Sequence, residues 1–153
     1  MNPTALRIGL ISDTHGLLRP EALAALQGSD HLIHAGDIGD PAILDALQRV
    51  APLTAVRGNN DTDAAYAAVR ILVIHDVKQL RPPMLRGCRV VVSGHSHKPS
   101  SVERDGVLYV NPGSAGPRRF SLPVAVGRLL LRDGMVEAEL IRLELAPGNK
   151  AKK

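Results

Sequence analysis

The chain is organised around one segment, LRIGLISDTHG, at residues 6–16. Its apolar run over residues 6–11 is typical of a buried strand, and a carboxylate and an imidazole follow where that strand ends. In extended chain, residues i and i+2 point the same way, so Asp13 and His15 can reach one ion together. The segment also fits an ordinary strand-to-helix turn with a capping Asp. The choice between these two interpretations depends on whether later strands end in similar metal-binding groups.

Apolar strands recur along the next ninety residues and alternate with short helical segments. Pro20 and Pro41 each open a short helix; Gly28 ends the first helix, and Asp40 caps the second. Residues 62–68 are expected to form a loop or a short helix, and residues 77–87, interrupted by two prolines, at most a short helix. The expected strands after the first are residues 31–35, 53–56, 71–74 and 89–92. This alternation predicts an α/β fold with a largely parallel sheet.

The last third of the chain has a different pattern. Asp105-Gly106 marks a turn before a strand that ends at Val110, and residues 123–131 and 135–143 form a hairpin around Asp133-Gly134. We expect this part to be a second, antiparallel sheet packed on the first. No linker separates the two parts, so the chain is predicted to be a single domain over residues 1–153, with a flexible tail from about residue 144.

Composition excludes several classes of protein. With 153 residues, 44% hydrophobic and 22% charged, the chain can bury a substantial core as a soluble protein. Only 2% of residues are aromatic, which counts against a stacking surface for single-stranded nucleic acid. The net charge of +4 comes from scattered residues, so nucleic acid is expected only as a substrate. Cys88 is the only cysteine, and neither a leader nor a membrane-length apolar run is present, so we expect a cytoplasmic protein without a membrane partner.

Polar groups that can bind metal follow five of the expected strands. They are two carboxylates, one amide and four imidazoles: Asp13, His15, Asp37, Asn59, His75, His95 and His97. Ligands bind at the carboxyl edge of open α/β sheets, so these groups predict a site there. Oxygen and nitrogen donors without a thiolate suit Mn²⁺, Fe²⁺, Co²⁺, Ni²⁺ or Zn²⁺. Seven ligand groups are more than one tetrahedral ion can bind, and they suit two ions about 3.5–4 Å apart.

These motifs stand in the order found in calcineurin-like metallophosphoesterases, which the chain resembles over residues 6–143. The matching motifs are Asp13-Thr14-His15, Gly36-Asp37, Gly58-Asn59-Asn60-Asp61, His75 and Gly94-His95-Ser96-His97. Asn111-Pro112-Gly113-Ser114 is similar to the small prokaryotic phosphodiesterase branch, to which Vps29 is related. The resemblance implies a four-layer α/β/β/α sandwich of two mixed sheets.

The resemblance also implies a role for each motif residue. It assigns Asp13, His15 and His97 to a first ion and Asn59, His75 and His95 to a second, with Asp37 as the bridge. Asp37, Asn59 and His95 are then the catalytic residues. The implied cofactors are two divalent transition-metal ions, with Mn²⁺ first and Ni²⁺, Co²⁺, Fe²⁺ or Zn²⁺ as alternatives.

The implied function is a metal-dependent phosphodiesterase, a hydrolase in which a metal-bridging hydroxide attacks the diester directly. Arg57, Asn60 and Arg118 are candidate substrate contacts, although each arginine can equally be a surface residue. A homo-oligomer is compatible with the sequence. The alternative is a Vps29-like scaffold or binding protein that keeps the fold with weak or no catalysis.

Two departures from the family pattern affect these expectations. Asn60 stands where many members carry a histidine that protonates the leaving group, which predicts a preference for diesters over alkyl monoesters. Asp76 follows His75 where the family commonly has Gly-His, and it is expected to be either a turn-capping residue or an extra ligand. Outside the motifs, His31 is expected at the surface and His34 to be packed in its strand, with a supporting role near Asp37 as the alternative.

Overall fold

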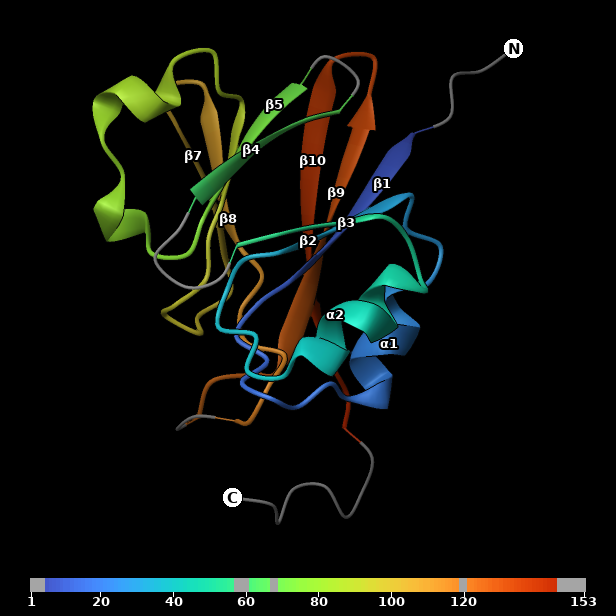
Figure 1. Ribbon diagram of the computed structural model, residues 1–153. Helices are drawn as coiled ribbons and strands as arrows, with labels where there is room; N and C mark the ends of the chain where they lie inside the picture. The colour runs from blue at the N-terminus through green and yellow to red at the C-terminus, as the bar shows by residue number, and fades with distance from the viewer. Residues whose placement is uncertain (1–4, 57–60, 67–68, 119–120, 146–153) are drawn as a thin grey trace.

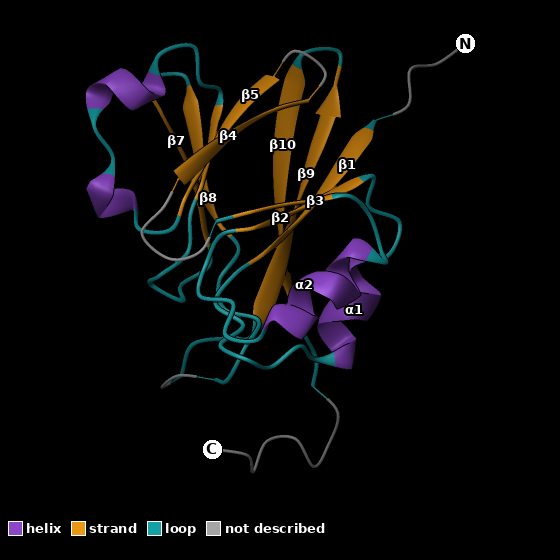
Figure 2. Cartoon of the chain, in the orientation of Figure 1, coloured by secondary structure: helices purple, strands orange, loops and turns teal. Residues whose placement is uncertain are grey.

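Two five-stranded sheets face each other, and two α-helices cover one of them (Figures 1 and 2). The computed structural model describes residues 5–56, 61–66, 69–118 and 121–145, and for residues 61–66 it describes only the backbone. The first sheet has the order β10-β9-β1-β2-β3 and the second the order β4-β5-β6-β8-β7. Both sheets contain parallel and antiparallel pairs, so the predicted α/β class with two mixed sheets is confirmed.

The elements follow one another in this order: β1 (Leu6–Ile11), α1 (Pro20–Leu26), β2 (His31–His34), α2 (Pro41–Gln48), β3 (Leu53–Ala55), β4 (Asp61–Tyr66), β5 (Val69–Ile74), η1 (Val77–Gln79), η2 (Pro82–Leu85), β6 (Val90–Val92), β7 (Ser100–Arg104), β8 (Val107–Asn111), β9 (Ala125–Arg132) and β10 (Met135–Arg142). Both α-helices begin with proline, and the Asp40 side chain caps α2 by accepting the Ala42 N–H at 2.9 Å.

Apolar side chains fill three layers. Ile8 and Ile33 of the first sheet meet Val73 and Val92 of the second sheet in the central core. A second cluster lies under α1 and α2, and a third lies on the outer face of the second sheet. The third cluster is covered by residues 77–85, so in the described residues two 3₁₀-helices lie where a four-layer sandwich would place α-helices. The two prolines of η2 explain why this covering segment stays short.

Two expectations about the strands are wrong. Residues 62–68 were expected to form a loop or a short helix, but residues 61–66 form β4, which pairs antiparallel with β5 from Asp61↔Ile74 to Tyr66↔Val69. The C-terminal hairpin was expected in the second sheet, but β9 pairs with β1, with Leu6 opposite Leu131. Hairpin patterning fixes which residues pair within the hairpin, whereas the free edge of β1 fixes where the hairpin docks.

These pairings bring the carboxyl ends of strands from both sheets to one end of the molecule. The Asp13 N–H donates to Gly36 O at 2.9 Å, which joins the loops after β1 and β2. The Gly94 N–H donates to His75 O at 2.9 Å, which joins the loops after β5 and β6. The site therefore lies where two sheets meet, and not along one parallel sheet as expected.

Two further predictions concern membrane association and the C-terminal tail. Within the described ranges, no helix has the length and apolar character needed to cross a membrane. Residues 146–153 lie outside the described residues, so the flexible tail and the single-domain extent stay predictions.

Candidate metal centre

Six of the seven predicted ligands gather in two adjacent groups. Each group holds one carboxylate and two imidazoles whose ligand atoms lie within 4.8 Å of one another: Asp13, His15 and His97 in the first, and Asp37, His75 and His95 in the second. The His15 and His97 rings stack with centroids 5.3 Å apart, and the His75 and His95 rings meet edge to face at 5.1 Å. The two groups agree with the division that the family resemblance implies, in which Asp37 is the bridge; the assignment to two ions stays a prediction.

The backbone at these residues adopts a conformation that is rare for side chains with a Cβ. Five of the six residues have positive φ: Asp13 (55°), His15 (47°), Asp37 (58°), His95 (72°) and His97 (65°). Each such residue costs on the order of 1–3 kcal/mol and persists only where its surroundings impose it. The strand-end loops thus turn sharply to aim these side chains at a common point.

The Asp13 carboxylate has one oxygen held by the protein and one without a hydrogen bond. Oδ2 accepts the Ser12 hydroxyl at 2.6 Å and the His95 N–H at 3.0 Å. Oδ1 is buried without a hydrogen-bond partner among the described residues, and it lies 3.5 to 4.0 Å from Nε2 of His97, His15 and His75. A buried carboxylate oxygen facing three imidazole nitrogens fits a position built around a cation.

His75 has the tautomer that a metal ligand needs. Its Nδ1 lies 2.8 Å from the carbonyl oxygen of Ala35, which cannot donate, so Nδ1 carries the proton. Nε2 is buried, has no hydrogen-bond partner among the described residues and lies 3.1 Å from Asp37 Oδ2, so its lone pair is available to an ion. A backbone carbonyl that holds the outer nitrogen of a histidine is the usual support for a ligating imidazole.

Asp37 connects the two groups. Its Oδ2 lies 3.1 Å from His75 Nε2 in its own group and 3.7 Å from His15 Nε2 in the other. The carboxylate is about one-third exposed, so it faces the open side of the cluster while Asp13 lies beneath it. This placement fits a carboxylate shared by two ions.

The backbone of Gly94 packs closely against Ser12 and the Asp13 carboxylate, with no room for a side chain at residue 94. A Cβ at residue 94 would collide with Ser12 Oγ and would lie 2.6 Å from Asp13 Oδ2. We expect Gly94→Ala to displace the carboxylate and to weaken metal affinity by about 10- to 100-fold, as loss of support for a ligand typically does. Titration of the purified protein with Mn²⁺ measures this affinity.

Gly134→Ala is the matched control for Gly94→Ala. Gly134 has a φ of +76° and no atom within 4 Å of an added Cβ, so alanine there strains the backbone without touching the cluster. It should lower the free energy of unfolding by about 1–2 kcal/mol and leave metal affinity unchanged. Equal metal affinity in Gly94→Ala and wild type would contradict the role given to Gly94.

His34 lies beneath the site and joins two of its loops. Its Nδ1 accepts the Gly36 N–H at 3.1 Å, so the proton is on Nε2, which donates to Thr14 Oγ1 at 3.1 Å. The Thr14 hydroxyl in turn donates to Ile38 O at 2.8 Å. Burial is the main cause that lowers the pKa of His34 to about 3, and His75 and His15 lower it further against the opposing effect of Asp37. His34 is therefore neutral and packed in β2, as predicted, and its contacts with the neighbouring loops also fit the alternative of a supporting role near Asp37.

This neutral histidine predicts a pH-dependent stability. Its pKa is about 3 in the fold and 6.5 unfolded, so the unfolded chain binds the extra proton between these values. The stabilisation by His34 should be complete above pH 6.5 and fall by about 1.4 kcal/mol per pH unit below it. Urea unfolding of wild type and His34→Gln with chelator should show a difference that shrinks as pH falls. A difference that is constant from pH 4 to pH 8 would contradict this assignment.

Other predicted residues are placed outside the two groups. Asp76 caps η1 by accepting the Lys78 N–H at 3.0 Å, and its second oxygen lies 3.8 Å from His95 Nε2. His31 is half-buried beside Thr54 rather than at the surface, and burial lowers its pKa. Arg118 is exposed, and its Nε donates to Leu122 O at 3.2 Å. Arg57, Asn59 and Asn60 lie outside the described residues, so their roles stay predictions.

Sequence reasoning missed the residues that brace the loops. The Ser114 hydroxyl donates to Asp13 O at 3.0 Å. Asn111 Nδ2 donates to Gly94 O and to Ser96 Oγ, both at 3.0 Å, and its Oδ1 accepts the Gly113 N–H at 2.8 Å. The Asn-Pro-Gly-Ser motif was the available signal, and the structure shows that it ties the loop after β8 to the loops after β1 and β6.

Fold and cluster together define a class of protein, the two-sheet α/β proteins that carry paired metal-ligand groups at the carboxyl ends of their strands. The model of the calcineurin-like phosphoesterase superfamily domain matches residues 6–134. The chain belongs to this family of metallophosphoesterases. The family and the two ligand groups together indicate that the chain binds divalent metal.

Similar sequences and structures agree with this family assignment. Probable metallophosphoesterases of Methanothermobacter thermautotrophicus and Methanocaldococcus jannaschii are each 35% identical to the chain, over 88% and 90% of it and 91% and 81% of their own lengths. Among solved structures, an archaeal phosphodiesterase has a TM-score of 0.74 at 21% identity, covering 89% of this chain and all of its own. Vacuolar protein sorting 29 of Cryptosporidium parvum has a TM-score of 0.71 at 18% identity, covering 90% and 97%. The structural likenesses show a shared fold.

Proposed function

We propose that this metallophosphoesterase is a phosphodiesterase with two divalent ions, of which Mn²⁺ is the first candidate. The observation that carries the proposal is the contact between the two ligand groups, in which Asp37 Oδ2 lies near imidazoles of both. Asp13, His15 and His97 would hold one ion, and His75 and His95, with Asn59, the other. When bound, such ions would supply Lewis acidity toward phosphate oxygens and would lower the pKa of a water, which makes hydroxide available as the nucleophile at neutral pH.

The chain's own groups would hold this chemistry in place. Asp13 is fixed through its Oδ2 and His75 through its Nδ1, so neither needs to reorient when an ion binds. His95 has a side chain that is 57% exposed, which places it at the open side where a phosphate would enter. Arg57, Asn60 and Arg118 stay candidates for contacts to the phosphate.

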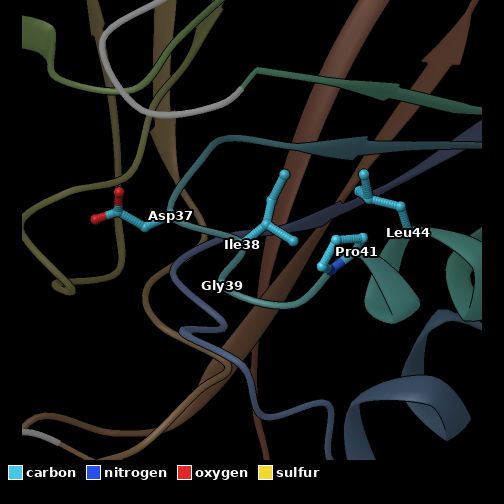
Figure 3. Close-up of a pocket in the computed structure, with 5 residues that line it drawn as sticks. All are labelled: Asp37, Ile38, Gly39, Pro41 and Leu44. Carbon is cyan, nitrogen blue, oxygen red and sulfur yellow. The ribbon is translucent and has the colours of Figure 1, made fainter.

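A pocket beside Asp37 can receive one of the two ester groups. It has a volume of about 330 Å³ and is lined by Asp37, Ile38, Gly39, Pro41 and Leu44 (Figure 3). In Figure 3 the Asp37 carboxylate points away from the apolar side chains of Ile38 and Leu44, so the pocket has a charged end and an apolar wall. With a divalent ion held by Asp37, a phosphate would lie at this end of the pocket and an organic group along the apolar wall.

Diester preference rests on two further supports. The solved archaeal phosphodiesterase shares the fold. Asn60 replaces a histidine that could protonate a poor leaving group, and an amide cannot supply that proton at neutral pH. Hydrolysis of bis(p-nitrophenyl) phosphate with added Mn²⁺ tests the proposal. It predicts turnover that chelator removes and Mn²⁺ restores, whereas the same turnover with and without chelator would overturn it.

The second candidate function is a scaffold that has weak or no catalysis. The likeness in fold to Vps29 of three organisms favours it, and one of those structures is a complex with zinc, so metal binding alone does not separate the two functions. The scaffold predicts bound metal and no diesterase turnover. Catalytic turnover therefore decides between the two functions.

A further inference from the structure

Among the four imidazoles of the two ligand groups, that of His95 lies mostly in solvent. Its side chain is 57% exposed, whereas those of His15, His75 and His97 are 33%, 4% and 4% exposed. The backbone of His95 is fixed, because its N–H donates to Asp13 Oδ2 at 3.0 Å. The orientation of its ring is a separate matter, since an exposed side chain is not held by packing.

The other three rings have partners that orient them. Nδ1 of His75 is held at 2.8 Å by the carbonyl oxygen of Ala35. The rings of His15 and His97 stack on each other, with their Nε2 atoms 3.4 Å apart. A ligating imidazole is normally oriented by a group that accepts a hydrogen bond from its outer nitrogen, so His95 needs such a group as well.

Asp76 is the acceptor placed to do this. The hydrogen bond of 2.9 Å from the Gly94 N–H to His75 O holds the loops after β5 and β6 together, and it sets Asp76 beside His95. Asp76 Oδ2 lies 3.8 Å from His95 Nε2, and among the described side chains no other carboxylate lies within 4.0 Å of this ring. The contact is longer than a hydrogen bond, and a small rotation of the exposed ring closes it.

The Asp76 carboxylate is itself held in place. Its Oδ1 accepts the Lys78 N–H at 3.0 Å and so caps η1, and its side chain is only 18% exposed. Oδ2 is therefore the oxygen that faces His95. An ionised carboxylate can only accept, so the ring nitrogen that pairs with it carries the proton and the other ring nitrogen keeps its lone pair.

We infer that Asp76 is a positioning residue for His95, which accepts the Nε2 proton and leaves Nδ1 as the nitrogen that binds the second ion. The inference rests on the proposed assignment of His95 to that ion, and it adds which nitrogen binds and what orients the ring. A carboxylate behind a ligating histidine fixes its tautomer and makes the binding nitrogen more basic. Asp76 thus acts on the ion through His95 and is not itself a ligand.

Asp76→Asn separates this role from the capping role. The amide oxygen can still accept the Lys78 N–H, which leaves the NH₂ group facing His95 Nε2. Two donors cannot pair, so the variant favours the tautomer with its proton on Nδ1, where the ion has to bind. We expect the affinity for one of two Mn²⁺ ions to fall about 10- to 100-fold, with the other affinity unchanged.

Asp40→Asn is the matched control. Asp40 caps α2 in the same way, by accepting the Ala42 N–H at 2.9 Å, and it is exposed. This variant should keep both Mn²⁺ affinities. Urea unfolding with chelator should give the same free energy of unfolding for wild type, Asp76→Asn and Asp40→Asn, because each cap is retained.

NMR of the imidazole nitrogens, in histidine-labelled protein loaded with diamagnetic Zn²⁺, reads the tautomer without any turnover. His95→Gln assigns the signals. We expect wild type to show metal-bound Nδ1 and protonated Nε2 at His95, and Asp76→Asn to lose the protonated Nε2 signal. Zinc bound through Nε2 in wild type would overturn the inference, and so would equal Mn²⁺ affinities in wild type and Asp76→Asn. A His95 ring that does not respond to Zn²⁺ would instead contradict its assignment to an ion, which belongs to the proposed function.

Discussion

Asp13→Asn should reduce diesterase activity by about 10³-fold or more and remove one of two bound ions. The amide is nearly isosteric, and its oxygen can still accept from Ser12 and from the His95 N–H, so the loop keeps its shape. What the substitution removes is the negative charge of Oδ1, which three imidazole nitrogens face from 3.5 to 4.0 Å. Loss of a group that acts directly on the reacting centre has effects of this size.

The control for Asp13→Asn is the same change at Asp133. Asp133 also has a positive φ, 53° against 55° at Asp13, but it is exposed in the turn of the β9–β10 hairpin. Asparagine tolerates this conformation as well as aspartate does, so Asp133→Asn should keep wild-type stability, metal content and activity. Full activity and two bound ions in Asp13→Asn would show that Asp13 is no ligand.

Asn60→His should increase hydrolysis of an alkyl phosphate monoester by about 10²- to 10⁴-fold. An alkoxide is a poor leaving group, so its departure depends on a proton donor, and a positioned general acid typically contributes this factor. Hydrolysis of bis(p-nitrophenyl) phosphate should change little, because nitrophenolate leaves without protonation. The two rates are measured side by side in wild type and variant.

Asn60→Gln is the control for this gain, because it keeps an amide at the same position and supplies no proton. Its hydrolysis of the alkyl phosphate should equal that of wild type. If wild type already hydrolyses the alkyl monoester as fast as the diester, the preference derived from Asn60 is wrong.

Local pattern predicted the elements well, and pairing between distant strands was harder to predict. The bounds of β1 and the proline-started helices α1 and α2 follow from periodicity and capping in short windows. β4 was missed because Asp61–Tyr66 is poor in the β-branched residues that mark strands, and its pairing with β5 is a tertiary effect. The hairpin was recognised, but its partner β1 lies more than a hundred residues away in the chain.

The candidate site was easier to predict than the sheets that carry it. Predicted ligands such as His75 and His97 lie in the loops that follow strands, so the sequence indicated that they would come close together even though their strands were assigned to one sheet instead of two. The supporting contacts were out of reach, because they depend on geometry between loops. The tautomer of His34, for example, is set by the Gly36 N–H and by Thr14, which come from different loops.

The number of ions bound per chain tests the central claim most directly. After incubation with Mn²⁺ and removal of unbound metal, native mass spectrometry of the intact chain should show two Mn²⁺ ions, and diesterase activity should rise as the second ion binds. A chain that saturates with one ion, or that reaches full diesterase activity with none, would contradict the assignment of Asp13, His15 and His97 to one ion and of His75 and His95 to another.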